Sequence, residues 1–509
     1  MVETISMAKY FDYFDIENDH LFLMDGSVSK IFKIECLDPS SMTKEELLAL
    51  NDKIAGLCQM VEKGIDLQIF FRSKNRYEKG LKLYDQYLET MRMDSRFASR
   101  LSLSKIDSLR SSNLFCSDIY VIINVHRFFD KKKSVETFDI NKKHLDKICN
   151  NINAYLQDIS RGVKSLEENE IANFLYECLN PGRWENIQEF NYKGKNSMIF
   201  DETLRSKLNF HGYLFNKDHF YAEGRYGQCI NLLNLPEETY PAMFFDLLSG
   251  FEKAFEFNFS YRISAVNQTA VVSFQDGMRN VYKSLLNTSL LGSDNTNYAV
   301  EKKMTENEQF LSAVSDGQQR IYEVGLCLTH YADTYENLTY QSDMILRSFR
   351  LLNGCDGFVE EYNQQKTFIS SLPASRAHLE KPFKFLTDNV ADFSPLYEPY
   401  KGTEKPTLLL RNRFNGIIKF DPFSAKDVQN YNAIVCGKSG SGKSFLISHI
   451  CQTFIAQGYP VIFVDIGGSF KRTVECFSGQ YFDLNENVSI NPLFPKSQVE
   501  KNGVISTVA

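Results

Sequence analysis

Residues 437–444 read Gly437-Lys438-Ser439-Gly440-Ser441-Gly442-Lys443-Ser444, an eight-residue run near the C-terminal end of the 509-residue sequence. The run matches the pattern GxxxxGK[ST] at every fixed position, which is the P-loop motif of nucleotide-binding proteins. Glycine lets the backbone curl until successive N–H groups face phosphate oxygens, and it leaves room for the phosphates to come close. This motif predicts a binding site for the phosphates of a nucleotide.

Two side chains of the motif carry further chemistry. Lys443 places a positive charge against the β and γ phosphates, so we assign it a catalytic role. Ser444 offers a hydroxyl to Mg²⁺, which prefers oxygen ligands. The predicted cofactors are ATP and Mg²⁺, and Ser444 is the predicted metal ligand. The predicted nucleotide-binding residues are Gly437, Lys438, Ser439, Gly440, Ser441, Gly442, Lys443, Ser444 and Phe445.

The sequence on either side of the motif agrees with this interpretation. Tyr431–Cys436 is a short apolar run that predicts a strand, and Phe445–Gln457 predicts an amphipathic helix. The N-terminus of that helix would add partial positive charge beside the phosphates. A second apolar run, Val461–Val464, predicts the next strand of a βαβ unit. A fortuitous Gly/Ser turn, which is the alternative, does not need these flanking elements.

Asp465 follows the second apolar run and invites comparison with the magnesium-binding aspartate of a Walker B strand. We favour a different interpretation, in which Asp465 marks the end of the strand. The magnesium aspartate of RecA-like motors comes from a later strand and has a catalytic glutamate beside it. Here Ile466 and Gly467 follow instead.

The rest of the chain predicts alternating helices and strands of an α+β protein. We expect three regions: an N-terminal α+β docking domain over 1–190, a second α+β region over 191–400, and a partial α/β P-loop (RecA-like) domain over 401–509. Expected hairpins are Leu21–Cys36, around Asp25-Gly26, and Leu408–Phe420, around Asn415-Gly416. Expected strands are Leu67–Phe71, Asp118–Val125, Phe257–Val266 and Ile321–Tyr331. Expected helices are Thr43–Val61, Tyr77–Met93, Lys142–Ile159, Glu168–Leu179, Thr269–Leu286, Glu301–Val314 and Tyr335–Leu352.

Composition excludes several classes of protein. The formal net charge of −7 gives no global reason to expect nucleic-acid binding, and the basic run Lys131–Lys133 fits a solvated loop. The 11 cysteines are scattered and form no CxxC pair, which indicates reduced thiols in a cytosolic protein. The sequence has no uninterrupted apolar run of about 18 residues, so we predict no membrane-spanning helix. The many Phe and Tyr residues fit core packing better than stacking on single-stranded DNA.

From about Gln365 onward the sequence resembles the TraC/TraG-type ATPases of conjugation and type IV secretion. The resemblance covers the whole chain and is most specific in the last third. The segments that carry it are Phe368-Ile369-Ser370-Ser371-Leu372-Pro373, Asp388-Asn389-Val390-Ala391-Asp392 with Pro395, Ile418-Lys419-Phe420-Asp421-Pro422-Phe423, Asn432, Ser444-Phe445, Asp465-Ile466-Gly467-Gly468-Ser469-Phe470 and Asn491-Pro492-Leu493. Weaker similarity includes Asp25-Gly26-Ser27 and Leu179-Asn180-Pro181.

The resemblance implies an oligomeric ATPase, expected to be a hexamer, that is cytoplasmic and peripheral on the inner face of the cell membrane. It implies docking on inner-membrane components of a secretion channel, and energy for pilus assembly and for the transfer of DNA or protein. The chain departs from the family in one respect. The Walker B Asp-Glu pair, the glutamine sensor and the arginine finger would lie beyond residue 509. We therefore expect a truncated motor domain that hydrolyses ATP poorly.

Two alternatives stay open on the sequence alone. The first is a non-enzymatic docking or assembly subunit of the same machine. The second is a P-loop protein of another class, such as a DNA-pumping ATPase or a nucleotide kinase. Coupling proteins that pump DNA usually carry N-terminal membrane spans, and a kinase needs lid and acceptor elements after the P-loop. Little chain follows Ser444 to supply such elements.

Overall fold

The structure is a computed structural model that describes residues 5–75, 81, 104, 106–112, 114–126, 134–181, 203–209, 211–288, 294–315, 317, 319–377, 381–403, 406–424 and 430–483. The chain divides into two units. The larger one comprises Met1–Tyr77, Leu114–Lys401 and Arg411–Ile417. The smaller one comprises Glu78–Asn113, Gly402–Leu410 and Ile418–Ala509.

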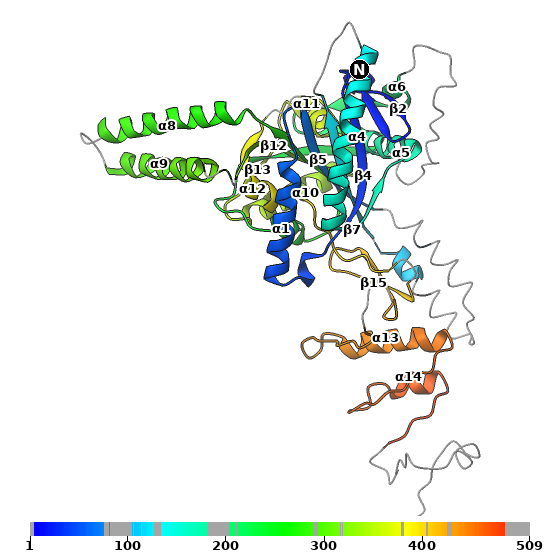
Figure 1. Ribbon diagram of the computed structural model, residues 1–509. Coiled ribbons are helices and arrows are strands. Elements are labelled where there is room, and N and C mark those ends of the chain that lie inside the picture. The colour runs from blue at the N-terminus through cyan, green and yellow to red at the C-terminus, as the bar shows by residue number, and fades with distance from the viewer. Residues whose placement is uncertain are drawn as a thin grey trace, which may run out of the picture. The chain divides into compact units, whose positions relative to one another are not determined.

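A fourteen-stranded sheet forms the framework of the larger unit (Figure 1). Its main order is β1-β8-β9-β10-β12-β11-β5-β6-β4-β3-β2, and β13, β14 and β7 pair with β10, β12 and β4. The strands are β1 Ile5–Ser6, β2 Tyr13–Glu17, β3 His20–Leu23, β4 Val28–Cys36, β5 Ile65–Lys74, β6 Cys116–Val125, β7 Ser160–Ser165, β8 Gly212–Phe215, β9 Phe220–Ala222, β10 Arg225–Asn234, β11 Glu256–Ala265, β12 Ile321–Ala332, β13 Asp356–Val359 and β14 Phe383–Leu386.

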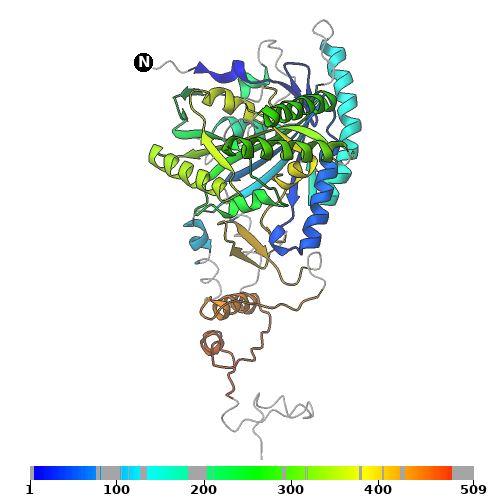
Figure 2. The same ribbon diagram turned by 90° about the vertical axis from the view of Figure 1, so that its left-hand side faces the viewer.

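Helices cover both faces of this sheet (Figure 1 and Figure 2). On one face the Phe71 ring of β5 packs against the Phe257 ring, with the two ring centroids 5.7 Å apart. The core on this face includes residues of α1, α4, α7, α10 and α12. On the other face the adjacent Phe70 packs against Phe174 of α5 at 5.7 Å. The helices are α1 Lys44–Gln59, α4 Ser134–Ile159, α5 Glu168–Leu179, α6 Leu204–Leu208, α7 Met243–Ser249, α8 Gln268–Thr288, α9 Asp294–Ser315, α10 Tyr335–Arg350, α11 Gln364–Ser371 and α12 Thr387–Asp392, with short 3-10 turns at Met7–Tyr10 and Pro39–Ser41. Because both faces are covered, the central strands are buried along nearly their whole length.

Several local predictions are confirmed. The β3–β4 hairpin turns at Gly26, whose φ of 85° favours glycine. Helix α1 begins after Thr43, whose hydroxyl accepts the Glu46 N–H at 3.3 Å while the Glu46 carboxylate accepts the Thr43 N–H at 2.8 Å. Of the other expected elements, the helix Tyr77–Met93, apart from Leu81, and the run Lys131–Lys133 lie outside the described residues.

The expected boundary at residue 190 falls inside the larger unit and has to be corrected. Strand β5 pairs with β11 over eight residues, with Phe71 opposite Phe259. Strands from 1–190 and from 191–400 thus share one sheet and one core. The reason is that β5 reaches its full hydrogen bonding only with a strand that lies about 190 residues further along the chain.

The smaller unit contains few regular elements among its described residues. A two-stranded sheet, β15 Leu408–Arg411 with β16 Ile417–Phe420, forms the hairpin that Asn415-Gly416 predicts, and its turn, Arg411–Ile417, is assigned to the larger unit. Two helices follow, α13 Lys443–Ala456 and α14 Lys471–Cys476. The predicted strands Tyr431–Cys436 and Val461–Val464 are wrong, because neither run pairs with a neighbouring strand within the described residues. Their apolar side chains stay outside a core, and Ile434 and Val464 are 89% and 95% exposed.

Candidate nucleotide-binding loop

Residues 437–442 form a tight turn that leads directly into helix α13. The Ser441 N–H donates to the Lys438 carbonyl at 3.2 Å, and the Leu446 N–H donates to the Gly442 carbonyl at 2.9 Å, which closes the first helical turn. Gly440 and Gly442 have φ angles of 77° and 90°, in the left-handed region that only glycine adopts without cost. The backbone conformation itself therefore favours glycine at positions 440 and 442.

Gly437 fits the turn for a different reason. A Cβ atom at this position would lie 2.6 Å from the Ser441 hydroxyl oxygen, which is closer than real Cβ contacts. A side chain here would therefore require the Ser441 hydroxyl to rotate away. By contrast, a Cβ at Gly440 or Gly442 would meet no atom within 4 Å, so at those two positions the backbone angle alone selects glycine.

The Lys443 side chain folds back over the loop that precedes it. Its ammonium donates to the carbonyl oxygens of Gly437 at 2.9 Å and of Lys438 at 2.8 Å. These two bonds hold a positive charge at the centre of the turn. Residues 437–442 are exposed, so the charge and the loop backbone can both be reached from solvent.

The remaining predicted site residues lie next to this turn. Ser439 and Ser441 belong to the exposed loop, and Ser444 and Phe445 are the second and third residues of α13. The Phe445 side chain is 80% exposed. The first N–H groups of a helix have no partner within the helix, and its N-terminus carries partial positive charge. Loop, lysine and helix start thus have the features that a phosphate group requires.

The described residues contain no group of three or more His, Cys, Asp or Glu side chains that could hold a metal ion. This does not conflict with a nucleotide-bound Mg²⁺, which usually takes one or two protein oxygens and completes its shell with phosphates and water. The Ser444 hydroxyl, exposed at the start of α13, fits that limited demand.

The segment after α13 supports the helix through contacts that no motif signals. The Thr473 hydroxyl of α14 lies 2.7 Å from the Ser448 hydroxyl of α13, and the Gln452 amide donates to Ser448 at 3.0 Å. Figure 1 shows α13 and α14 next to each other, in orange and red-orange. The Asp465 carboxylate accepts the Phe470 N–H at 3.1 Å, so here it stabilises the turn that leads into α14.

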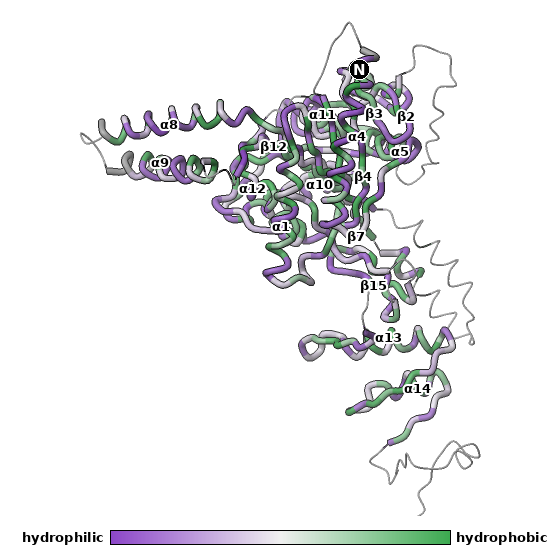
Figure 3. Tube along the Cα trace, viewed as in Figure 1, coloured by the Kyte–Doolittle hydropathy of each residue, from purple (hydrophilic) through white to green (hydrophobic). Residues whose placement is uncertain are grey.

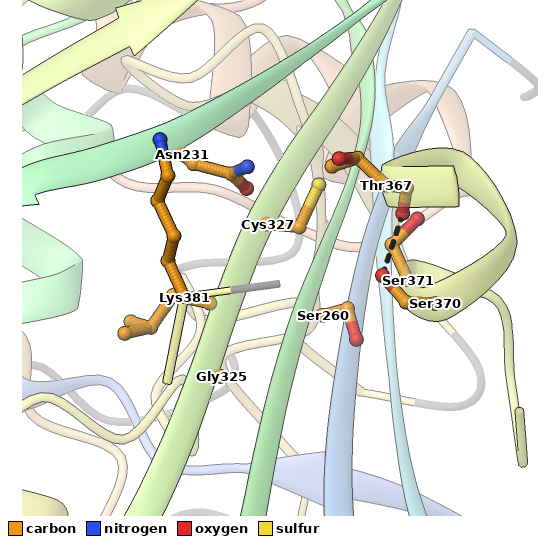
Figure 4. A pocket seen from close by; sticks show the side chains of 9 residues that line it. Asn231, Ser260, Gly325, Cys327, Thr367, Ser370, Ser371 and Lys381 are labelled. Carbon is orange, nitrogen blue, oxygen red and sulfur yellow. Dashed lines mark hydrogen bonds between the residues drawn. The ribbon is translucent and has the colours of Figure 1, made fainter. Parts of the chain in front are cut away.

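A separate polar pocket lies in the larger unit, between β10, β12 and α11 (Figure 4). Its wall includes Asn231, Cys327, Thr367 and Ser371. The cavity measures about 20 Å³, which is room for roughly one water molecule. Among the described residues, the buried Asn231 Oδ1 and Thr367 Oγ1 have no hydrogen-bond partner, as expected where a water completes the network. The pocket is far too small for a nucleotide.

A glycine turn that requires left-handed angles, a lysine folded onto it and a helix that starts there define the class of P-loop proteins. Comparisons with known proteins place the chain more closely. Residues 415–508 match the TraG P-loop domain, and residues 159–379 match the "CagE, TrbE, VirB family, component of type IV transporter system". Together with the relative described below, these two matches support a TraC/TraG-type family of type IV secretion ATPases.

Protein TraC of Escherichia coli (strain K12) is 27% identical to this chain over 217 residues. The match covers 40% of this chain and 24% of TraC, so the chain spans about a quarter of this relative's length. Among the described residues, no helix has both the length and the apolar character needed to cross a lipid bilayer.

Proposed function

We propose that this chain binds ATP with Mg²⁺ through residues 437–445, as a motor subunit of a conjugative type IV secretion system. In that role it energises pilus assembly and the transfer of DNA or protein. The observation that supports the proposal is the Lys443 ammonium, held within hydrogen-bonding distance of two loop carbonyls at the start of α13. Inner-membrane channel components and further copies of the chain are the expected partners. The expected location is the cytoplasmic face of the membrane.

The chain's own residues would act mainly by positioning and by charge. Backbone N–H groups of the loop and of the start of α13 would donate to the phosphate oxygens. Lys443 would exchange its two carbonyl partners for the β and γ phosphates. The negatively charged phosphates attract its ammonium more strongly than neutral carbonyl oxygens do. The Ser444 hydroxyl would hold Mg²⁺, and the bound ion would neutralise charge on the phosphates.

Hydrolysis by this polypeptide is expected to be weak. Residues 445–509 contain no adjacent Asp-Glu pair of the kind that binds magnesium and activates water in RecA-like motors. Asp465 has Ile466 beside it and accepts a hydrogen bond from the backbone. We therefore expect nucleotide binding without efficient turnover.

The test is an equilibrium titration with a fluorescent ATP analogue in the presence of Mg²⁺. A hydrogen bond to a charged group contributes about 1.5–3 kcal/mol, so Lys443→Ala should weaken binding roughly 10- to 150-fold. Lys471→Ala, which removes an exposed lysine of α14, is the matched control and should bind as the unaltered chain does. Equal affinity of the Lys443→Ala chain would reject the nucleotide site and favour a docking subunit without nucleotide chemistry.

Turnover is measured separately, as phosphate release from ATP at saturating concentration. Steady turnover that Lys443→Ala abolishes would contradict the expected weak hydrolysis while leaving the binding site intact.

A further inference from the structure

Helices α8 and α9 form an arm that projects from the sheet of the larger unit (Figure 1). They run side by side, and Asn307 of α9 donates from its amide to the Gln275 Oε1 of α8 at 2.7 Å. Asn307 is 7% exposed, and Gln275, Met278 and Tyr282 of α8 are partly buried, so this side of α8 faces α9. Much of the opposite side of α8 is exposed within the described part of the chain, as at Ser273, Gly277 and Asn280.

That uncovered side of α8 carries an apolar stripe. Ala270, Phe274, Gly277, Val281 and Leu285 follow one another at spacings of four, three, four and four, which puts them on one face of the helix. Phe274 is 61% exposed, and Val281 and Leu285 are each 48% exposed. A Cβ at Gly277 would meet no atom within 4 Å. Figure 3 shows hydrophobic and hydrophilic residues alternating along this helix.

No charged residue of α8 interrupts the stripe, although the ammonium of Lys384 in β14 lies 5.9 Å from the centre of the Phe274 ring. Helical geometry places Ser273, Asn280 and Ser284 along its edge. The charged residues of α8 turn to other sides of the helix, where Arg279 lies 3.1 Å from Asp276. A face of this kind over four turns fits another helix better than water.

The charge of the arm argues against a membrane as the occupant. Residues 268–315 contain five acidic and four basic side chains. An anionic lipid surface attracts segments with an excess of Lys and Arg, which this arm lacks.

The order of residues along the stripe favours a second copy of the same chain. Position 279 is the midpoint between Gly277 and Val281, which lie two residues before and two residues after it. Phe274 lies five residues before this midpoint, and Leu285 lies six residues after it. Two such helices that run antiparallel would place Val281 of each copy in the hollow over Gly277 of the other. Phe274 would meet Leu285 in the same way. A contact with two-fold symmetry uses one patch twice, and this patch is complementary to itself.

We propose that the α8 stripe, defined by Ala270, Phe274, Gly277, Val281 and Leu285, pairs antiparallel with the α8 stripe of a second copy. Helix α8 has 21 residues and is about 30 Å long, so the contact stays near the lower limit of stable interfaces. We therefore expect a low affinity between two α8 helices. The effective affinity is higher where other contacts already hold two copies of the chain together.

The first test is sedimentation of the full chain over a range of concentrations. The unaltered chain should dimerise reversibly, and Val281→Glu should weaken the association at least tenfold by placing a charge in the contact. Lys283→Glu makes a larger change of charge on the far side of α8 and should leave association unchanged. The proposal is overturned if the unaltered chain stays monomeric, or if Val281→Glu associates equally well. Circular dichroism checks that both variants fold.

The second test reports the direction of pairing and needs no charged variant. Gly277→Cys and Val281→Cys are prepared separately in a chain whose exposed Cys436 and Cys476 are replaced by serine. Oxidised glutathione should then link the two proteins when they are mixed, and far less when each is alone. Equal linkage of each variant alone would reject the antiparallel arrangement. Binding of the arm to phosphatidylglycerol vesicles, lost in Val281→Glu, would instead identify a lipid partner and overturn the proposal.

Discussion

Asp118 of β6 offers a quantitative test of what holds the larger unit together. Its carboxylate is buried and lies 2.7 Å from the ammonium groups of both Lys33 and Lys74, which come from the neighbouring strands β4 and β5. Burial alone would raise the pKa of Asp118, but the attraction of Lys74, Lys33 and Lys401 outweighs burial and holds the pKa well below its ordinary value. The charged form of Asp118 therefore stabilises the fold.

Asp118→Asn keeps the size of the side chain and removes its charge. Breaking a buried ion pair by removing one partner costs about 3–5 kcal/mol. The Lys33 side chain is 40% exposed and can return to water, so we expect the lower end, about 3 kcal/mol. Urea unfolding of the larger unit at pH 7, followed by circular dichroism, measures the loss. Asp52→Asn, at an exposed position of α1, is the control and should change stability by less than about 0.5 kcal/mol.

The pH dependence provides a second check on the same variant. Because the folded pKa of Asp118 is depressed, its contribution is fully present above the unfolded value of about 3.9 and is lost as the pH falls further. The stability difference between the unaltered chain and Asp118→Asn should therefore shrink below about pH 4. A loss under about 1 kcal/mol at pH 7, or a difference that persists unchanged at pH 2, would refute the reasoning.

Three further predictions concern single positions. Gly227→Ala should cost about 1–3 kcal/mol, because its Cβ would overlap the buried ring of Phe220, and Phe220→Leu in the same chain should recover part of the loss in urea unfolding. Burial lowers the pKa of His330 to about 4, below its unfolded value of about 6.5. Stability should accordingly fall as the pH decreases from about 6.5 to about 4, by at most about 3 kcal/mol, and His330→Gln should flatten this slope in unfolding curves measured across that range. Gly442→Ala should weaken binding of the ATP analogue roughly 5- to 30-fold, because alanine at a φ of 90° costs about 1–2 kcal/mol; unchanged affinity would show that the loop can take another shape.

The sequence predicts well those elements whose causes are local. The turn at Gly26, the capping box of Thr43 with Glu46 and helix α5 at Glu168–Leu179 each depend on residues a few positions apart. The sheet as a whole escapes prediction, because its central pairing joins Phe71 to Phe259. The residue pattern of a strand does not indicate which other strand it pairs with. For this reason the sequence did not reveal that the boundary expected at residue 190 falls inside one unit.

The candidate site divides in the same way. The motif at residues 437–444 is contiguous, so the loop and the start of α13 could be predicted from their order alone. The flanking apolar runs, Tyr431–Cys436 and Val461–Val464, were wrongly predicted to be strands. Their composition favours a strand, but a strand also needs a hydrogen-bonded neighbour. The carbonyl partners of Lys443 and the contact between Ser448 and Thr473 depend on side-chain geometry, which sequence patterns do not encode.

The pairing of β5 with β11 also affects how the chain folds during synthesis. Strand β6 emerges soon after β5 and can cover one edge of it, but the other edge must wait for β11. At 5–20 residues per second the ribosome needs roughly 10–40 s to make the intervening segment of about 190 residues. Throughout that interval an apolar strand edge is open to other nascent chains, so this protein should depend on chaperones while it is being made.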